Sequence, residues 1–413
     1  MIALDKQMAR GIISKVVYLT YNPPFFTTRG EIGLHLTLRE SEKQILRVVR
    51  TKKLISRAAI ARETKLSKPV VSEGVARLIN MGVLVEVKKG KSSNKGGKRP
   101  ILLSLRPDFC YIVGLDIGGT NMRVVLTDLE GRVVEKRVSR TGKLKSENDL
   151  LLKSVDLIDS VMTVPREKIL GIGVGVPGTV DPETGFIYNI PALELKNVRL
   201  REFLEDRYDL STFLANDVTL NALGEMWRGA AKGKRNVLLV SIGTGLGAGL
   251  IVNQALYEGA HGMAGEMGFT VTDWTKEKKL NFELFGALES WVSGYGLEKR
   301  LREEGFRITV EEFFNMLGKN NRFDQIFEEA CEHLALALGN AIVLLDPDVV
   351  VIAGGIGYNQ YERMINYVLP IIKKTVLPEL LSKVDFIRAE LGEFGVAIGA
   401  AGWVQRKSFV GWD

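Results

Sequence analysis

The stretch IVGLDIGGTN, residues 112–121, decides the fold of the larger part of the chain. An apolar run ends in an acidic residue and a Gly-Gly-Thr turn, and a second apolar run follows at 123–127, which together predict a β-hairpin. The glycines of such a turn let backbone N–H groups approach a phosphate, the threonine adds a hydroxyl, and the aspartate can hold Mg²⁺ through water. Glycine turns between strands are common, so this motif needs support from the rest of the chain. Its nucleotide-binding candidates are Asp116, Gly118, Gly119 and Thr120.

The same transition from an apolar strand to a glycine turn occurs twice more. Residues 237–242 run into a Gly-Thr-Gly turn and return as a strand at 250–252, and residues 349–353 run into a Gly-Gly turn. Three such turns, two of which open hairpins, predict two related lobes around a nucleotide cleft. A G-x-G-x-x-G dinucleotide site is not expected, because the first turn opens a hairpin rather than the helix of a βαβ unit. The added candidates are Gly243, Thr244, Gly245, Gly354 and Gly355.

The charge of the chain is unevenly distributed. The 413 residues carry a net charge of +7, but residues 39–106 hold 18 Lys and Arg against 5 Asp and Glu, which is +13; residues 1–38 carry +2 and residues 107–413 carry −8. This asymmetry predicts a nucleic-acid-binding module joined to a domain with another role. Two cysteines are too few for a disulfide framework and favour a reducing cytoplasm. No apolar run reaches about 18 residues, so no membrane span is expected.

The basic segment has the pattern of a helix-turn-helix. Apolar residues recur at helical spacing in three stretches, and a serine stands at the N-cap position of the second and of the third. The turn between these two helices is short, as the motif requires. The expected helices are 40–50, 57–64 and 68–80, with Ser56 and Ser67 as N-caps.

Two strand-like stretches, 83–87 and 101–105, flank a loop rich in Lys and Gly and predict a wing. The second helix of a helix-turn-helix lies in the major groove with its N-terminal residues nearest the bases, and wing cations contact phosphate or the minor groove. The alternative is a solvated protein-interaction module with a charged loop. The DNA-binding candidates are Ser67, Lys68, Pro69, Ser72, Glu73, Arg77, Lys88, Lys89, Lys98 and Arg99.

Between the first two glycine turns lies an Asn-Asp pair at the end of a predicted strand, 213–217, followed by a predicted helix, 218–227. Asp217 would accept the proton of a substrate hydroxyl as it attacks a γ-phosphate, which is the base role in phosphoryl transfer. Asn216 would hydrogen-bond a neighbouring hydroxyl. The alternative for an isolated pair is that both residues cap the helix, and taken alone it is the preferred one.

The array resembles the ROK family, which groups sugar-responsive repressors with bacterial sugar kinases. The A-G-E-x-G-H motif of that family appears at 264–269 and its G-C-x-E motif at 286–289, within a resemblance that covers about residues 111–402. The layout is similar to the actin-like ATPase and sugar kinase superfamily, which implies an α/β fold: a winged helix-turn-helix followed by a two-lobed, ribonuclease H-like body. The resemblance also implies that Asp217 is the catalytic base of the kinases, and that the sugar-binding residues are Asn216, Asp217, Glu266, Glu289, Gly178 and Asn189.

The chain departs from the family at its zinc site. The four positions that hold a histidine and three cysteines in the family are all apolar here, so we expect no structural zinc and no other metal at this site. The family's histidine also contacts the sugar, and a phenylalanine in its place can pack or stack but cannot provide that hydrogen bond. The four positions are Phe269, Leu280, Phe282 and Ala287.

The leading hypothesis is a cytoplasmic, sugar-responsive transcriptional repressor. It would bind operator DNA as a homodimer or homotetramer, without a cofactor, and sense a sugar in the cleft between the lobes. The alternative is an ATP-dependent hexose or N-acetylhexosamine kinase using ATP and Mg²⁺, or a protein with both activities, since the phosphoryl-transfer residues are all present. A third possibility, a repressor titrated by a protein partner, leaves no readable pattern.

The domain organisation follows from these assignments. We expect an N-terminal extension of uncertain structure, then the winged helix, then the kinase-like body. The first lobe of the body would span about 107–215 together with the C-terminal helix, and the second about 216–395. The expected domains are 1–38, 39–106 and 107–413.

Overall fold

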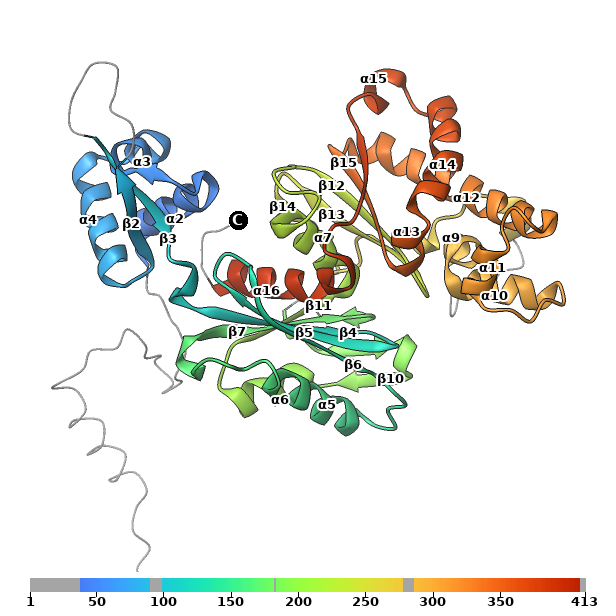
Figure 1. Cartoon of the computed structure of the whole chain (residues 1–413), viewed down its shortest axis with the longest axis horizontal. Coiled ribbons are helices and arrows are strands. Elements are labelled where there is room, and N and C mark those ends of the chain that lie inside the picture. Colours follow the sequence, from blue (N-terminus) through green and yellow to red (C-terminus); the bar gives the residue numbers. More distant parts are fainter. Residues whose placement is uncertain (1–37, 90–98, 182, 278–285, 409–413) are drawn as a thin grey trace, which may run out of the picture. The chain divides into compact units, whose positions relative to one another are not determined.

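The computed structural model describes residues 38–89, 99–181, 183–277 and 286–408 (Figure 1). The chain divides into two compact units, residues 1–105, called here the N-terminal unit, and residues 106–413, called here the body. Among the helices in these ranges, none has both the length and the apolar character needed to cross a membrane.

The N-terminal unit is a winged helix-turn-helix, as the sequence predicts. Three helices pack around a small buried core that includes Ile45, Val75 and Leu78. The predicted N-caps form: the Ser56 side chain accepts a hydrogen bond from the Ala59 N–H, at 3.3 Å, and Ser67 caps the third helix in the same way. The helices are α2 (Glu40–Lys52), α3 (Arg57–Thr64) and α4 (Lys68–Asn80), and the sheet has the order β1 (Ile55–Ser56), β3 (Ile101–Leu105), β2 (Leu84–Lys89).

The first lobe of the body is built on a five-stranded sheet in which the predicted hairpin is central. The hairpin is antiparallel, and two further strands extend the sheet in parallel on its other side. A separate three-stranded sheet covers one end. The main sheet has the order β11 (Thr212–Asn216), β7 (Ile169–Val176), β4 (Tyr111–Ile117), β5 (Asn121–Asp128), β6 (Val133–Arg140); the small one comprises β8 (Thr179–Val180), β9 (Ile187–Ile190) and β10 (Leu195–Val198). Helices α5 (Glu147–Asp159) and α6 (Leu200–Tyr208) pack on the outer face of the main sheet.

The second lobe repeats this plan, as the three glycine turns predict. An antiparallel hairpin is extended by two parallel strands, and a helical layer dominated by α12 (Asn321–Leu345) and α14 (Tyr361–Thr375) packs beside it around a large apolar core. The sheet order is β14 (Ala255–Leu256), β13 (Leu246–Val252), β12 (Val237–Ile242), β15 (Val349–Ala353), β16 (Asp385–Arg388). The shorter helices are α8 (Trp274–Glu277), α9 (Ala287–Val292), α10 (Gly294–Glu303), α11 (Val310–Asn315), α13 (Gly355–Asn359) and α15 (Pro378–Leu381).

Strand β13 begins earlier than the sequence predicts, at Leu246 rather than at residue 250. The sequence predicts a shorter strand because Gly247 and Gly249 have low strand propensity. Their role is to admit a helix: a Cβ on Gly249 would lie 2.7 Å from the carbonyl oxygen of Val218. A close helix approach therefore replaces side-chain packing on this face of the strand.

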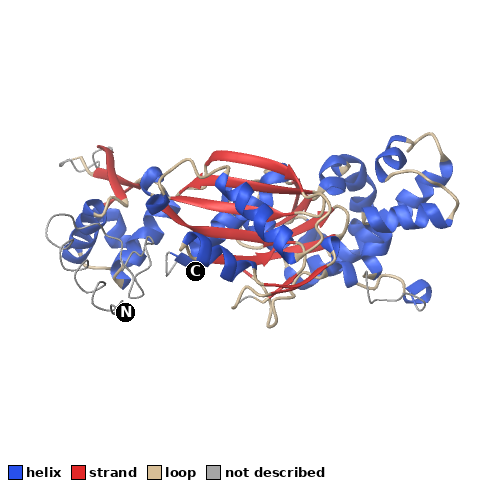
Figure 2. Cartoon of the chain, turned by 90° about the horizontal axis from the view of Figure 1, so that it is seen from below, coloured by secondary structure: helices blue, strands red, loops and turns tan. Residues whose placement is uncertain are grey.

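Two helices, α7 (Asp217–Arg228) and α16 (Gly395–Ser408), lie between the two sheets of the body (Figure 1). Helix α16 packs on β4 and β7 of the first lobe, whereas α7 packs on β12 and β13 of the second. The helices cross at Gly399, where any Cβ would overlap the carbonyl oxygen of Leu220. In the turned view, the strands of the body lie together and helices of the body run across them (Figure 2). The lobes thus meet across one glycine-lined helix pair.

Candidate functional site

The first glycine turn joins β4 to β5 and places a buried carboxylate at its base. Asp116 stands directly opposite Arg123 in the hairpin register. The Arg123 Nη1 group donates to Asp116 Oδ2 at 3.3 Å, and its Nε group donates to Glu393 at 3.1 Å. The sequence reasoning missed Arg123, although the strand pairing on either side of the turn is a signal that would have found it.

The turn itself is fixed from a neighbouring strand. Thr141 donates through its hydroxyl to the Gly118 carbonyl at 2.5 Å, and through its N–H to the Thr120 carbonyl at 2.9 Å. Thr120 and Gly119 remain exposed. The carbonyl groups are therefore used in holding the turn, while the exposed side offers a hydroxyl and backbone N–H groups of the kind that bind phosphate.

The second and third glycine turns come together because β12 and β15 are parallel neighbours whose carboxyl ends coincide. A Cβ on Gly243 would lie 3.7 Å from the N atom of Gly355. Gly354 adopts a φ of 80°, which favours glycine, and lies against the backbone of Ile242. Thr244, a predicted nucleotide-binding residue, follows Gly243 in the second turn and is exposed. All the nucleotide-binding candidates of the second lobe thus share one edge of its sheet.

The Asn-Asp pair sits where β11 passes into α7. Asn216 Oδ1 accepts hydrogen bonds from the N–H groups of Val218 and Thr219, at 3.0 and 3.2 Å, so Asn216 is the N-cap that the alternative interpretation describes. Asp217 Oδ1 also accepts from the Val218 N–H, at 2.9 Å. The Asn216 amide points to the Gly178 carbonyl at 3.5 Å. Capping and ligand binding are compatible, because each side chain keeps polar atoms that the cap does not use.

Asn189 belongs to the adjoining small sheet, and Gly178 lies directly before its first strand. Gly178 precedes β8, and a Cβ there would overlap the carbonyl oxygen of Asn189 on β9. This close approach places both residues beside Asn216. The structure therefore brings the three residues into one neighbourhood.

The two remaining carboxylates lie in the second lobe. Glu266 follows Gly265, whose φ of 95° and close contact with Ala248 pin the loop to β13. Glu289, on α9, accepts hydrogen bonds from the Leu246 N–H at 2.9 Å and from the Gly286 N–H at 3.3 Å. Glu289 thus links the glycine turn after β12 to the start of α9. Its bond to Gly286 has the local capping-box spacing, whereas no local sequence pattern indicates its bond to Leu246.

Four carboxylates, called here the carboxylate cluster, influence one another electrostatically. Burial, with the Asp217 charge, raises the pKa of Asp116 to about 7 in spite of Arg123. Burial and the Glu266 charge raise the pKa of Asp217 to about 6, and burial and the Glu289 charge raise the pKa of Glu266. Burial also raises the pKa of Glu289. The cluster therefore concentrates hydrogen-bond acceptors with an elevated proton affinity, as in sites that bind or deprotonate hydroxyl groups. Its members are Asp116, Asp217, Glu266 and Glu289.

We expect Asp217→Asn to stabilise the body by about 3 kcal/mol at about pH 8. Because the folded pKa of Asp217 is raised, the folded state binds this proton more tightly than the unfolded chain, and stability is lost as the pH rises from about 4 through 6. The gain from the substitution should shrink as the pH falls and vanish near pH 4. Thermal unfolding of wild type and variant between these pH values checks this; an equal difference at both ends would contradict it.

The exposed face of α4 carries the sequence-predicted DNA contacts. Ser67, Lys68, Pro69 and Ser72 are exposed at its N-terminal end, together with Val70, and the inward face is buried at Val71, Gly74 and Val75. Helix α4 is the second helix of the helix-turn-helix motif, and an exposed N-terminal end on that helix is the geometry that major-groove binding requires. Lys88 and Arg99 are exposed on the wing, whereas Lys98 and the side chain of Lys89 lie outside the described part of the chain.

Two of the predicted DNA contacts form ion pairs within the N-terminal unit. Arg77 lies 3.2 Å from the fully buried Glu42 on α2. Glu73 lies 2.6 Å from Arg39, and both of these side chains are exposed. Arg77 therefore links α4 to α2, while Glu73 remains on the exposed face of α4.

The positions that hold zinc in the resembled family are only partly visible. Phe269 is 48% exposed and Ala287 is fully buried, while Leu280 and Phe282 lie outside the described residues. Within the described ranges, no three His, Cys, Asp or Glu side chains form a group suited to a metal ion.

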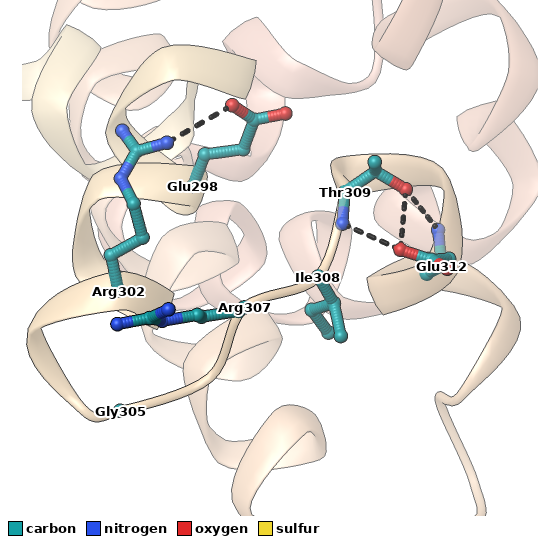
Figure 3. Close-up of a pocket in the computed structure, with 7 residues that line it drawn as sticks. All are labelled: Glu298, Arg302, Gly305, Arg307, Ile308, Thr309 and Glu312. Atoms are coloured by element: carbon teal, nitrogen blue, oxygen red, sulfur yellow. Dashed lines mark hydrogen bonds and ion pairs between the residues drawn. The ribbon is translucent and has the colours of Figure 1, made fainter.

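A surface pocket of about 730 Å³ lies on the helices of the second lobe (Figure 3). Arg302 pairs with Glu298 at its rim, at 3.6 Å, and Glu312 accepts hydrogen bonds from Thr309 at the start of α11. None of the sequence-predicted site residues lines it. Its polar groups serve helix ends and ion pairs, and we assign it no part in function.

Known proteins resemble this chain both in sequence and in structure. The model of the ROK family matches residues 112–407. A xylose repressor of Caldicellulosiruptor bescii is 30% identical over 340 residues, which cover 78% of this chain and 84% of the relative. A glucokinase of Halalkalibacterium halodurans is 27% identical over 317 residues, which cover 72% of this chain and 95% of the relative. The crystal structure of a ROK family transcriptional regulator, a homologue of Escherichia coli Mlc, covers 90% of this chain and 96% of its own, with a TM-score of 0.76 at 19% identity, and so shares the fold.

Proposed function

The chain belongs to the ROK family, and from this premise we propose that it is a sugar-responsive transcriptional repressor. One observation carries the proposal: the kinase-like body follows, along the chain, a winged helix-turn-helix whose recognition helix α4 is exposed at its N-terminal end. A kinase has no use for such a module, whereas a repressor requires it. The charge division, +13 against −8, supports the same assignment of roles, because only the basic unit attracts DNA phosphates.

We propose that DNA is bound by two or four copies of the chain. A single helix-turn-helix reads only a few base pairs, and proteins of this kind pair two recognition helices about one turn of DNA apart, or a multiple of it. The operator would therefore be a two-fold repeat that matches the symmetry of the protein.

The sugar would bind at the carboxylate cluster and the adjoining amide of Asn216. Sugar hydroxyls donate hydrogen bonds, and carboxylates are the strongest acceptors a protein offers. Asn216 ends β11 of the first-lobe sheet, whereas Glu266 lies in a loop and Glu289 on α9 of the second lobe, so one ligand would touch elements of both lobes. The sugar must bind the open and closed arrangements unequally to have an effect. Rotation at the crossing of α7 and α16 would then change the separation of the recognition helices.

The test is binding of the full chain to a labelled duplex from the region upstream of its own gene. The duplex is titrated at low and at moderate salt, with and without a sugar panel that includes xylose, because one relative of this chain is a xylose repressor. We expect specific binding that at least one sugar changes. Failure to bind this duplex better than a shuffled one, in every sugar condition, would contradict the proposal.

Kinase activity is a second candidate function, favoured by the intact glycine turns and by Asp217. The residues fit a nucleotide: Thr120 and Thr244 expose hydroxyls on glycine turns, and Asp116 can hold Mg²⁺ through water. ATP would supply the phosphoryl group, and Asp217, with its pKa raised to about 6, would take the proton of the sugar hydroxyl. An ATP-consumption assay over hexoses and N-acetylhexosamines decides. Sugar-dependent turnover in wild type that Asp217→Asn abolishes would establish the activity, and its absence would remove it.

A further inference from the structure

The exposed face of α4 contains one acidic side chain within a strongly basic unit. Its outward residues along the first two turns are small, apolar, hydroxylic or cationic, with the exception of Glu73, which is 68% exposed. A carboxylate on a DNA-facing surface is repelled by the phosphates, so it weakens general affinity. Such a residue is useful only where it meets a hydrogen-bond donor on the DNA.

Arg39 holds this carboxylate in a defined position. Its Nη1 group donates to Glu73 Oε1 at 2.6 Å, across from the N-cap of α2 to the second turn of α4. The hydrogen bond and the charge of Glu73 raise the pKa of Arg39. Among the residues that the structure describes, none donates a hydrogen bond to Glu73 Oε2. One carboxylate oxygen is thus engaged, in a side chain that is 68% exposed.

Arg77 provides an internal contrast on the same helix. It lies one turn beyond Glu73 but pairs with Glu42, which is fully buried beneath the helix. This ion pair fixes the helix against α2, so Arg77 acts in positioning. The Glu73–Arg39 ion pair, by contrast, joins two exposed side chains, and the contact of Arg39 with Glu42 is made by its backbone N–H, at 2.9 Å. The exposed pair therefore needs another explanation.

DNA offers few donors to a carboxylate. In the major groove, the cytosine N4 amino group is the donor that Glu and Asp characteristically accept from, while guanine presents only acceptors there. A carboxylate already bonded to an arginine can still accept a second hydrogen bond, because it has about four lone-pair sites. The arginine also neutralises the charge that phosphates would repel.

We propose that Glu73, held by Arg39, is a base-reading residue that selects a cytosine in each half-site through a hydrogen bond from cytosine N4 to Oε2. This inference rests on the proposed function, since it requires α4 to occupy the major groove. It assigns Arg39 as a positioning residue that orients the carboxylate and cancels its charge.

The first experiment selects binding sequences for the full chain from a pool of duplexes with randomised half-sites. Wild type should enrich cytosine at one position of each half-site. Glu73→Gln should shift that position to adenine, which glutamine reads, and leave the others unchanged. Glu73→Ala should remove the preference at that position alone. An unchanged cytosine preference in both variants would overturn the inference, as would a change spread over all positions.

The second experiment measures affinity for the selected duplex and for the same duplex with that C·G pair changed to T·A. The change should weaken wild type about tenfold and Glu73→Ala less than twofold. Arg39→Ala should weaken binding of both duplexes about tenfold, Arg39→Lys should restore most of the affinity, and Arg39→Ala combined with Glu73→Ala should bind better than Arg39→Ala alone. If the double variant binds as poorly as Arg39→Ala, Arg39 does not act through Glu73 and its positioning role is wrong.

These outcomes separate the inference from the function on which it rests. If wild type selects no sequence and binds no duplex above background, the repressor assignment itself fails. If wild type selects a clear two-fold sequence that Glu73 variants leave unchanged, the repressor assignment stands and the reading role of Glu73 fails.

Discussion

Lys68→Glu is expected to weaken binding of the full chain to the duplex from upstream of its own gene by at least about 100-fold at about 0.1 M salt. Lys68 is the first residue of α4 and is exposed, so in the proposed complex its ammonium group lies between base edges and phosphates. The substitution removes this attraction and adds a negative charge in the same place. Fluorescence anisotropy over a range of salt concentrations measures the loss and should give a shallower salt dependence.

This substitution separates binding from folding. A carboxylate at the N-terminus of a helix is favoured by the helix dipole, so the thermal stability of the N-terminal unit should be unchanged or slightly higher. Lys383→Glu, at an exposed lysine of the body, changes the net charge equally and should leave DNA affinity within about twofold. Equal losses in the two variants would mean that overall charge, rather than α4, governs binding.

Gly399→Ala is expected to lower the free energy of unfolding of the body by about 4 kcal/mol, one of the larger effects for a single methyl group. The new Cβ would overlap the carbonyl oxygen of Leu220, and backbone of α7 cannot yield as a flexible side chain can. Because α7 begins at Asp217, any displacement also disturbs the carboxylate cluster. The sugar response should therefore weaken at temperatures where the body is still folded.

Tryptophan fluorescence measures this effect on the intact chain, since all five tryptophans lie in the body. Urea unfolding should show an earlier midpoint for Gly399→Ala. Gly355→Ala is the matched control: no atom lies within 4 Å of its added Cβ, and its backbone is not in the left-handed region. A Gly399→Ala midpoint no lower than that of the control would refute close packing at this crossing.

The local features of the fold were predictable from the sequence because they depend on residues near one another. The caps Ser56 and Ser67, the glycine turns and the start of α7 each follow from what a few adjacent residues can adopt. The two-lobed architecture followed from the recurrence of one turn pattern. The family resemblance then identified candidate site residues that no spacing rule alone would have joined.

The features that escaped prediction depend on contacts between distant segments. The Glu289 carboxylate accepts a hydrogen bond from the Leu246 N–H of β13, a contact that nothing in the surrounding sequence indicates. In the sequence, Gly399 is one small residue of an apolar helix, and only the structure shows that the Leu220 backbone lies against it. Arg77 has the position of a DNA contact but the partner of a structural residue. In each case the deciding neighbour lies far away in the chain.

Coupling between the cleft and the DNA is tested most directly by one titration. The full chain is bound to the labelled duplex, and each sugar of the panel is added to wild type and to Asp217→Asn. At least one sugar should change the DNA affinity of wild type about tenfold or more, while Asp217→Asn, with equal affinity in the absence of sugar, should not respond. If no sugar changes the affinity of wild type, or if Asp217→Asn responds as strongly, the cleft of the body does not control DNA binding.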